Sequence, residues 1–219
     1  EKYGIDARTF TEVTHVDEKK KKVYGVQLKT GTALEIDYDR LLIATGSDPV
    51  LPNWKGIELD GIHPLKTLID TKSILQDLNN KIKNVTIVGG GYVGLEMAES
   101  FHSLGKNVTL IQRSDQLATI FDLDMATIIH QEAEQHQISF ILGEEVEGFS
   151  GDKRVNTVIT DKGSYSTDLV LLSVGVKPNT DFLQNSAIHM NAQGAIHVNA
   201  YMQTSIPHIY AAGDCATQY

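Results

Sequence analysis

The amino-acid sequence predicts an α/β fold with a parallel β-sheet at its centre. The order strand–helix–strand–helix–strand across residues 84–142 favours parallel strands joined by right-handed crossovers. The apolar run at residues 168–175 (DLVLLSVG) adds a further strand, which we expect to be buried on both faces. A chain of 219 residues, 41% of them hydrophobic, is long enough to bury a core of this kind.

Apolar spacing and end signals define the elements of this core. Gly105 is expected just after the end of one helix, and Asp122 at the N-cap of the next. The expected helices are residues 67–80, 92–105 and 122–136. The expected strands are residues 84–91, 107–113 and 138–142, followed by a β-meander of two or three strands over residues 144–166.

The remaining chain is expected to form strands, turns and loops. Two strands, residues 11–17 and 22–29, are joined by a run of four lysines that is typical of a solvated turn. Residues 39–49 (DRLLIATGSDP) predict an apolar strand, buried on both faces, that runs into a turn. Residues 50–64, with their prolines and glycines, are expected to be a linker, and the chain is rich in loops from residue 180.

Charge and composition exclude several classes of function. The formal net charge is −9 at pH 7, and a field of this sign repels DNA and RNA. The sequence contains no run of about 18 apolar residues and no signal peptide, so no membrane association is expected. The single cysteine, Cys215, cannot form an intrachain disulfide, which favours a reducing, cytoplasmic location.

The strongest functional signal is a glycine-rich motif, GGGYVG, between an apolar strand and a helix. In this context, G-x-G-x-x-G marks a Rossmann-like NAD(P)-binding domain. Gly89 permits the tight turn, Gly91 lets the backbone approach a pyrophosphate, and Gly94 lets the helix pack closely on the strand. The unpaired N–H groups of the helix N-terminus then favour the phosphates. The alternative is a glycine-rich turn that only packs well. The residues expected to line the dinucleotide site are Gly89, Gly90, Gly91, Tyr92, Val93 and Gly94.

The choice between NADH and NADPH depends on the end of the second strand. An acidic residue about 20 positions after the motif normally binds the adenosine ribose, but Gln112 occupies this position here, followed by Arg113. Gln112 does not repel a 2′-phosphate as a carboxylate would, and Arg113 could pair with one. NADPH is therefore as compatible with the sequence as NADH. The alternative is that Arg113 stacks on the adenine or faces solvent.

No metal site is expected. The eight histidines show no zinc-ligand spacing beside cysteines. His130 and His136 are six residues apart on one predicted helix, which does not place them on one face, and both are expected to be surface residues.

Four sequence blocks, in order, resemble the signature segments of a known family. The blocks are ATGSDP (residues 44–49), VGGGYVGLEMAE (88–99), VGVKPN (174–179) and TSIPHIYAAGDC (204–215). They resemble the pyridine nucleotide–disulfide oxidoreductases, most closely the branch of coenzyme A-disulfide reductases, NADH oxidases and NADH peroxidases. The resemblance covers essentially all 219 residues, and four ordered blocks are more specific than any single glycine motif.

The resemblance implies an NAD(P)H-binding Rossmann domain inserted in a split FAD-binding domain. Residues 1–50 correspond to the late part of the first FAD segment, residues 60–178 to the NAD(P)H domain, and residues 180–219 to the return of the FAD domain. The flavin-binding glycine motif and the redox cysteine are expected upstream of Glu1, and a dimerisation domain after Tyr219. The chain is therefore expected to be an internal piece of a homodimeric enzyme, without a catalytic residue of its own.

The resemblance also assigns roles to single residues. Tyr92 should gate the nicotinamide pocket and Glu96 should order the contact between flavin and nicotinamide; alternatively, Tyr92 covers the sheet edge and Glu96 is an acid of the first helical turn. Asp214 should hydrogen-bond FAD, or else cap its own turn. Cys215 is expected to be a small buried residue. Further contacts are expected from Gly175 and Val176 with NAD(P)H, and from Ala44, Thr45, Gly46, Thr204, Pro207 and Gly213 with FAD.

The implied activity is that of an FAD-dependent NAD(P)H oxidoreductase. Hydride would pass from NADH or NADPH to FAD and then to a disulfide, as in coenzyme A-disulfide reductase, or to oxygen or peroxide, as in the NADH oxidases and peroxidases. The cofactors carry the redox chemistry and the protein positions them. This piece alone is not expected to turn over. A second hypothesis is a nucleotide-binding module without catalysis.

Overall fold

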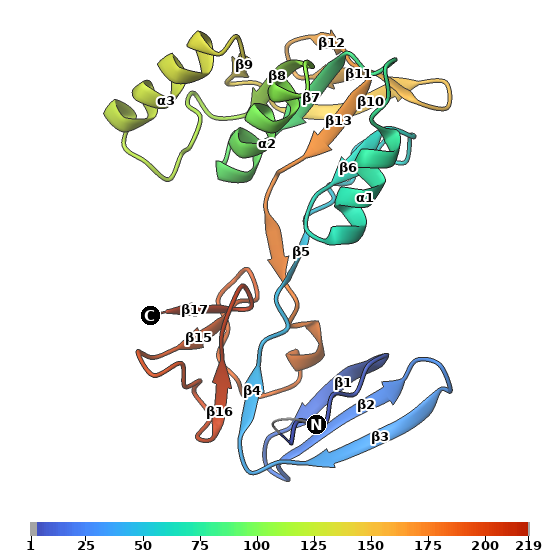
Figure 1. Cartoon of the computed structure of the whole chain (residues 1–219). Helices are drawn as coiled ribbons and strands as arrows, with labels where there is room; N and C mark the ends of the chain where they lie inside the picture. The colour runs from blue at the N-terminus through green and yellow to red at the C-terminus, as the bar shows by residue number, and fades with distance from the viewer. Residues whose placement is uncertain (1–3, 219) are drawn as a thin grey trace. The chain divides into compact units, whose positions relative to one another are not determined.

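The computed structural model describes residues 4–218 and divides the chain into two compact units. The segment Pro49–Gly175 forms one of them, called here the inserted unit, while Glu1–Asp48 and Val176–Tyr219 together form the split unit. The chain passes between them through two short paired strands, β5 (Ser47–Pro49) and β14 (Val176–Pro178) (Figure 1). Within residues 4–218, no helix is long and apolar enough to cross a membrane.

A parallel sheet forms the centre of the inserted unit, as predicted, and β6 adds a fifth strand that was not expected. Its strand order is β6-β13-β7-β8-β9, and each neighbouring pair runs parallel. The glycine motif directly follows the middle strand, β7, so its loop lies at the carboxyl edge of the sheet. The strands are β6 (Ile62–Pro64), β13 (Leu169–Leu172), β7 (Asn84–Val88), β8 (Asn107–Gln112) and β9 (Ser139–Leu142).

The two faces of this sheet are buried against different layers. Leu169 and Leu171 of β13 pack with buried residues of three helices, α1 (Leu68–Asp77), α2 (Tyr92–Ser103) and α3 (Leu123–Gln135). Val170 and Leu172 pack with the predicted meander, which has three antiparallel strands, β10 (Val146–Gly151), β11 (Val155–Thr160) and β12 (Ser164–Ser166). Consecutive strand residues point to opposite faces, so all four residues of β13 are buried, as predicted.

The helix ends follow the sequence signals in part. Gly105, just after α2, has a φ of +71°, a left-handed conformation that glycine adopts at little cost. Asp122 is the N-cap of α3, but its side chain makes no capping hydrogen bond. At the start of α1, Thr67 and Asp70 form a reciprocal capping box, which the sequence analysis did not identify.

Residues 50–64 do not form a linker, which corrects the expectation. Lys55 bridges to Gly148 of β10, and the Lys55 carbonyl accepts the Phe149 N–H at 2.7 Å. Trp54 packs edge-on against Phe149, with ring centroids 5.9 Å apart. Ile62–Pro64 then forms β6, an edge strand, where proline is tolerated because one side needs no ladder hydrogen bonds. The segment is thus part of the inserted unit.

Small sheets make up the split unit. Strands β1 (Thr11–Asp17), β2 (Lys22–Gln27) and β3 (Thr32–Asp37) form an antiparallel sheet in that order. The sequence pattern predicts the first two strands, whereas β3 was not expected. The other pairs are parallel: β4 (Leu41–Ile43) with β16 (Ile209–Ala211), and β15 (Ile196–Val198) with β17 (Ala216–Gln218).

The expectation that residues 39–49 form a strand buried on both faces is wrong. The strand β4 spans three residues, and Leu42 at its middle is 61% exposed. Leu41 and Ile43 point to the other side, into a core cluster that includes Leu183 and Ile209. In the described part of the chain, β4 therefore has one buried face and one open face.

Candidate nucleotide-binding site

Two glycines of the motif are required by the backbone geometry of the loop after β7. Gly89 has a φ of +106°, and a Cβ there would lie 2.1 Å from the Ser173 carbonyl oxygen. A Cβ on Gly94, in the first part of α2, would lie 2.1 Å from the Gly89 carbonyl oxygen. Since real Cβ atoms do not approach backbone this closely, only glycine fits at either position. The predicted roles of Gly89 in the turn and of Gly94 in helix–strand packing are confirmed.

Gly91 differs, because it faces open space. It is the N-cap of α2, and a Cβ placed on it would meet no heavy atom within 4 Å. No acidic residue lies in the first turn of α2. The unpaired N–H groups and the positive end of the helix dipole are therefore not neutralised within the helix. This geometry suits a phosphate group that approaches the backbone at Gly91.

A cleft of about 480 Å³ lies along the carboxyl ends of the parallel strands. Its lining comes from the ends of β13, β7, β8 and β9, which are neighbours in the sheet. Nucleotides bind at this edge of open α/β sheets. The lining residues are Val50, Pro52, Trp54, Val88, Gly89, Gly91, Ile111, Gln112, Arg113, Thr119, Glu144, Glu145, Val146, Ser173, Val174 and Gly175.

Gln112 connects the end of β8 to the glycine loop. Its side-chain carbonyl accepts the Gly90 N–H at 2.9 Å. Its amide donates to the Ser114 hydroxyl, which in turn donates to the Gln116 carbonyl at 3.2 Å. Gln112 therefore positions the loop, and it adds no negative charge where an acidic residue would bind a ribose.

Charged groups of both signs line the part of the cleft that follows β8 and β9. Arg113 is exposed there, where it can reach a ligand. Glu144 follows β9 and accepts hydrogen bonds from the hydroxyls of Tyr165 (2.9 and 3.0 Å) and Thr160 (2.7 Å). The hydrogen bond to Glu144 raises the pKa of Tyr165 above its usual value. Sequence reasoning missed Glu144, because a carboxylate just after a short strand resembles an ordinary turn residue.

Tyr92 and Glu96 lie on α2 outside the lining of this cleft. Tyr92 is the first residue of the helix and is 73% exposed. Glu96 is exposed one turn later, and the first turn contains no acid, so its alternative role as a first-turn acid is wrong. Val93 and Gly94 also lie on α2, while Val176 begins β14 and is 51% exposed.

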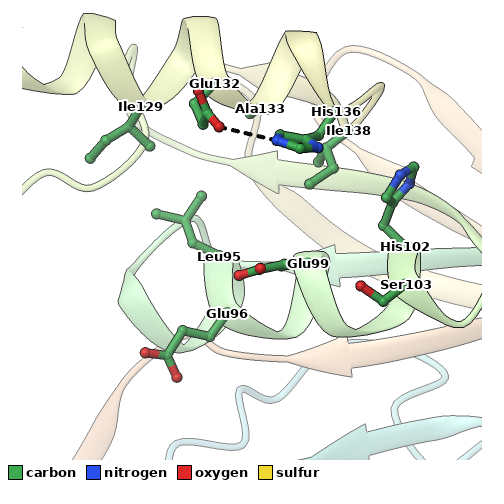
Figure 2. Close-up of a pocket in the computed structure, with 10 residues that line it drawn as sticks. All are labelled: Leu95, Glu96, Glu99, His102, Ser103, Ile129, Glu132, Ala133, His136 and Ile138. Carbon is green, nitrogen blue, oxygen red and sulfur yellow. Dashed lines mark hydrogen bonds and ion pairs between the residues drawn. The ribbon is translucent and has the colours of Figure 1, made fainter.

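A second cavity, of about 400 Å³, lies between α2 and α3 (Figure 2). Leu95 and Ile129 point toward each other across it, whereas Glu96 points away from α3. On its α3 wall, His136 lies 3.1 Å from Glu132. Of the predicted site residues, this cavity contains only Glu96.

The two histidines of α3 have different environments. His136 is a surface residue, as expected, with its side chain 61% exposed. His130 is not, which corrects the expectation: its Nε2 accepts the Leu117 N–H at 2.9 Å, and its ring packs on Phe140 at a centroid distance of 5.2 Å. Leu117 is fully buried beside Gly90. His130 thus supports the wall behind the glycine loop.

In the split unit, the ends of β4 and β16 bring two predicted FAD segments together. These strands are parallel, so Ala44–Gly46 and Gly213–Asp214 emerge at the same edge. The Ala212 N–H donates to the Ile43 carbonyl at 3.0 Å. The Ser47 hydroxyl donates to the Asp214 carboxylate at 3.0 Å, and the Thr45 hydroxyl donates to the Asn179 carbonyl at 2.6 Å.

Thr204 and Pro207 are not part of this edge. Both precede β16 and lie at its opposite end from Gly213 and Asp214. Thr204 is buried, and its hydroxyl accepts the Ile206 N–H at 3.1 Å, so it closes its own loop. Cys215 is fully buried, with its Sγ 3.3 Å from the Ala212 carbonyl, and its expected role as a small buried residue is confirmed.

Comparisons with known proteins agree with this architecture. The family model of the pyridine nucleotide-disulphide oxidoreductases matches residues 1–219. An NADH oxidase of Streptococcus pyogenes is 41% identical over 83% of this chain and 42% of its own length. A CoA-dependent NAD(P)H sulfur oxidoreductase of Pyrococcus furiosus is 37% identical over 98% of this chain and 48% of its own. The chain thus spans under half the length of these relatives.

Solved structures of oxidoreductases also resemble this chain. A water-forming NADH oxidase from Lactobacillus brevis, bound to NADH, superimposes with a TM-score of 0.86 and 35% identity, over 94% of this chain and 46% of that protein. Reduced CoADR-RHD of Bacillus anthracis superimposes with a TM-score of 0.89 and 28% identity, over 98% of this chain and 39% of that protein. The chain therefore belongs to the pyridine nucleotide-disulphide oxidoreductase family.

Proposed function

We propose that this chain supplies the NAD(P)H-binding portion and part of the FAD-binding portion of an FAD-dependent oxidoreductase. The inserted unit, Pro49–Gly175, would bind NAD(P)H, and the split unit would contribute to FAD binding. The observation that carries the proposal is the cleft at the carboxyl edge of the parallel sheet, with Gly91 open to it at the N-terminus of α2. The family membership and the NADH-bound relative support the same reading.

The residues of the cleft fit the parts of a dinucleotide in order along the sheet edge. The pyrophosphate would lie at Gly91 and the first N–H groups of α2. The adenosine ribose would lie at Gln112 and Arg113, after β8. The nicotinamide half would then pass toward Gly175, at the end of β13. Tyr92, Glu96 and Val176 would contact it from outside this cleft.

For FAD, the edge after β4 and β16 offers small residues and hydrogen-bonding groups. Gly46 and Gly213 leave open space, since a Cβ on either would meet no heavy atom within 4 Å. Thr45 and Asp214 hold the two segments in place through Asn179 and Ser47. When bound, the flavin accepts hydride from NAD(P)H, and the protein orients the two rings. Thr204 and Pro207 lie at the opposite end of β16, so this FAD edge does not include them.

The terminal electron acceptor would be a disulfide, as in coenzyme A-disulfide reductases. A relative described as a CoA-dependent NAD(P)H sulfur oxidoreductase, 37% identical, supports this choice. The second candidate is oxygen, supported by the NADH oxidase of Streptococcus pyogenes at 41% identity. Either acceptor uses the same NAD(P)H cleft.

Calorimetric titration of the purified chain with NADH and with NADPH tests the proposal, with FAD titrated alongside. Saturable 1:1 binding of at least one nicotinamide cofactor is expected without added FAD. Circular dichroism confirms that the chain is folded. A folded chain that binds neither nicotinamide cofactor would overturn the proposal for the inserted unit.

A further inference from the structure

Trp54 is the single tryptophan of the chain and forms part of the wall of the nucleotide cleft. It lies in the segment that follows β5, which sequence composition alone suggests to be a linker. Its ring is half-buried and packs edge-on against Phe149 of β10. It also packs against the apolar cluster on the meander face of the sheet, so the same residue belongs to this cluster and to the lining of the cleft.

Backbone hydrogen bonds fix the segment that carries this ring, and Phe149 packs against the ring itself. The Trp54 N–H donates to the Pro52 carbonyl at 2.8 Å, and the Trp54 carbonyl accepts the Ile57 N–H at 3.3 Å. The next carbonyl, that of Lys55, accepts the Phe149 N–H at 2.7 Å. An aromatic ring fixed in this way offers contact area to a ligand with little loss of side-chain entropy.

We propose that Trp54 contacts the bound nicotinamide dinucleotide and contributes to its affinity, an inference that rests on the proposed function. Among the described residues that line the cleft, Trp54 is the only aromatic one. The rest of the lining consists of glycines, small or aliphatic residues, and polar or charged residues such as Gln112, Arg113 and Glu144. Heteroaromatic rings stack on indole, and clefts of this type use aromatic walls to bury such rings. The indole thus supplies the apolar surface that the glycine loop lacks.

Substitutions test the contact through NADH affinity. Trp54→Ala should raise the Kd for NADH about tenfold, and Trp54→Phe, which keeps an aromatic ring, should raise it less than about threefold. Ile57→Ala is the matched control, because Ile57 belongs to the same segment and the same apolar cluster but does not line the cleft. It should lower the melting temperature and leave the Kd unchanged.

Fluorescence of the wild-type chain gives a second measurement that needs no variant. NAD⁺ is the probe, because it does not absorb the indole emission as NADH does. Saturating NAD⁺ should reduce acrylamide quenching of Trp54 at least twofold, since the ligand covers the ring. If Trp54→Ala is too unstable for titration, the acrylamide measurement on the wild-type chain is sufficient to test the contact.

The outcomes separate this inference from the proposed function. An unchanged Kd in Trp54→Ala, or unchanged acrylamide quenching with NAD⁺ bound, would overturn the role of Trp54 while the cleft still binds its ligand. Failure of the wild-type chain to bind NADH, NADPH or NAD⁺ would overturn the proposed function and this inference with it. The role of Trp54 would be supported by weaker NADH binding in Trp54→Ala, near-normal binding in Trp54→Phe and protection of the wild-type indole from acrylamide.

Discussion

The side-chain carbonyl of Gln112 accepts the backbone N–H of Gly90 at 2.9 Å, so the end of β8 is tied to the glycine loop after β7. Two neighbouring strand ends therefore share one hydrogen-bonded structure. In the proposed binding mode, the side chain that sets the charge near the adenosine ribose would also be the side chain that holds the glycine loop. We therefore expect cofactor preference and loop geometry to be coupled at Gln112.

Gln112→Glu separates these two roles. The carboxylate still accepts the Gly90 N–H but adds a negative charge where a 2′-phosphate would lie. We expect the Kd for NADPH to rise at least about tenfold and the Kd for NADH to change little. Calorimetric titration with both cofactors measures this. The control Gln112→Ala removes the tie without adding charge and should weaken both cofactors equally; equal weakening by Gln112→Glu would show that charge at this position is irrelevant.

Arg113 is expected to favour NADPH over NADH. A guanidinium paired with a phosphate forms charge-assisted hydrogen bonds that NADH cannot offer. Arg113→Ala should raise the Kd for NADPH about ten- to a hundredfold, with less than about a threefold change for NADH. Arg113→Lys keeps the charge and should retain most of the preference. An equal loss for both cofactors would show instead that Arg113 stacks on the adenine, which both cofactors share.

Gly91 and Gly94 form a matched pair for separating binding from folding. Gly94→Ala places a methyl group 2.1 Å from the Gly89 carbonyl oxygen, and it should reduce the free energy of unfolding by about 3 kcal/mol. Gly91→Ala meets no protein atom and has an ordinary φ of −78°, so stability should stay near that of the wild type. Its methyl group occupies the space proposed for the pyrophosphate, so NADH binding should weaken at least about tenfold. Urea denaturation measures the stability of both variants, and calorimetry measures their affinity for NADH. Normal NADH binding by Gly91→Ala would contradict the proposed position of the pyrophosphate.

Asp77 makes the stability of the inserted unit depend on pH. Arg154 donates two hydrogen bonds to Asp77, at 2.7 and 2.8 Å, and these lower the pKa of Asp77 below its usual value of 3.8. Because the folded-state pKa is depressed, the stabilisation is fully present above pH 3.8 and is lost as the pH falls through the folded-state value. Asp77→Asn should reduce the free energy of unfolding at pH 7 by about 1–3 kcal/mol.

Urea denaturation at several pH values measures this effect. The difference between the wild type and Asp77→Asn should shrink once the pH falls below 3.8. Glu132→Gln is the control, because Glu132 lies in the same unit and its pair with His136 is about two-thirds exposed. The control should change stability little. A difference for Asp77→Asn that is constant with pH would contradict the role of its charge.

The sequence predicts the elements whose signals are local. Four of the five parallel strands and the three helices are predicted correctly, because their apolar pattern reflects burial within each element. The geometric roles of Gly89 and Gly94 are also predictable, since a strand, a tight turn and a helix leave room only for glycine. Residues 84–172 are therefore the part of the chain that sequence reasoning describes best.

The missed features depend on distant parts of the chain. Trp54 is packed by Phe149, almost 100 residues away, and no local pattern distinguishes its segment from a linker. His130 is held by the Leu117 backbone, which helical spacing does not reveal. Leu42 is exposed although its strand is apolar, because only one face of β4 meets a core in the described residues. Thr204 begins a sequence block that resembles a family motif and was expected to contact FAD, yet its hydroxyl accepts a hydrogen bond within its own loop.

The central claim is that a nicotinamide dinucleotide binds across the carboxyl edge of the sheet, with its pyrophosphate at the N-terminus of α2. NMR of the backbone amide and indole N–H groups of the chain, with and without NADH, tests this location most directly. The account predicts the largest shifts at Gly91 and Tyr92, with further shifts at Gln112, Arg113 and the Trp54 indole. Shifts confined to the cavity between α2 and α3, around Leu95 and His136, would contradict it.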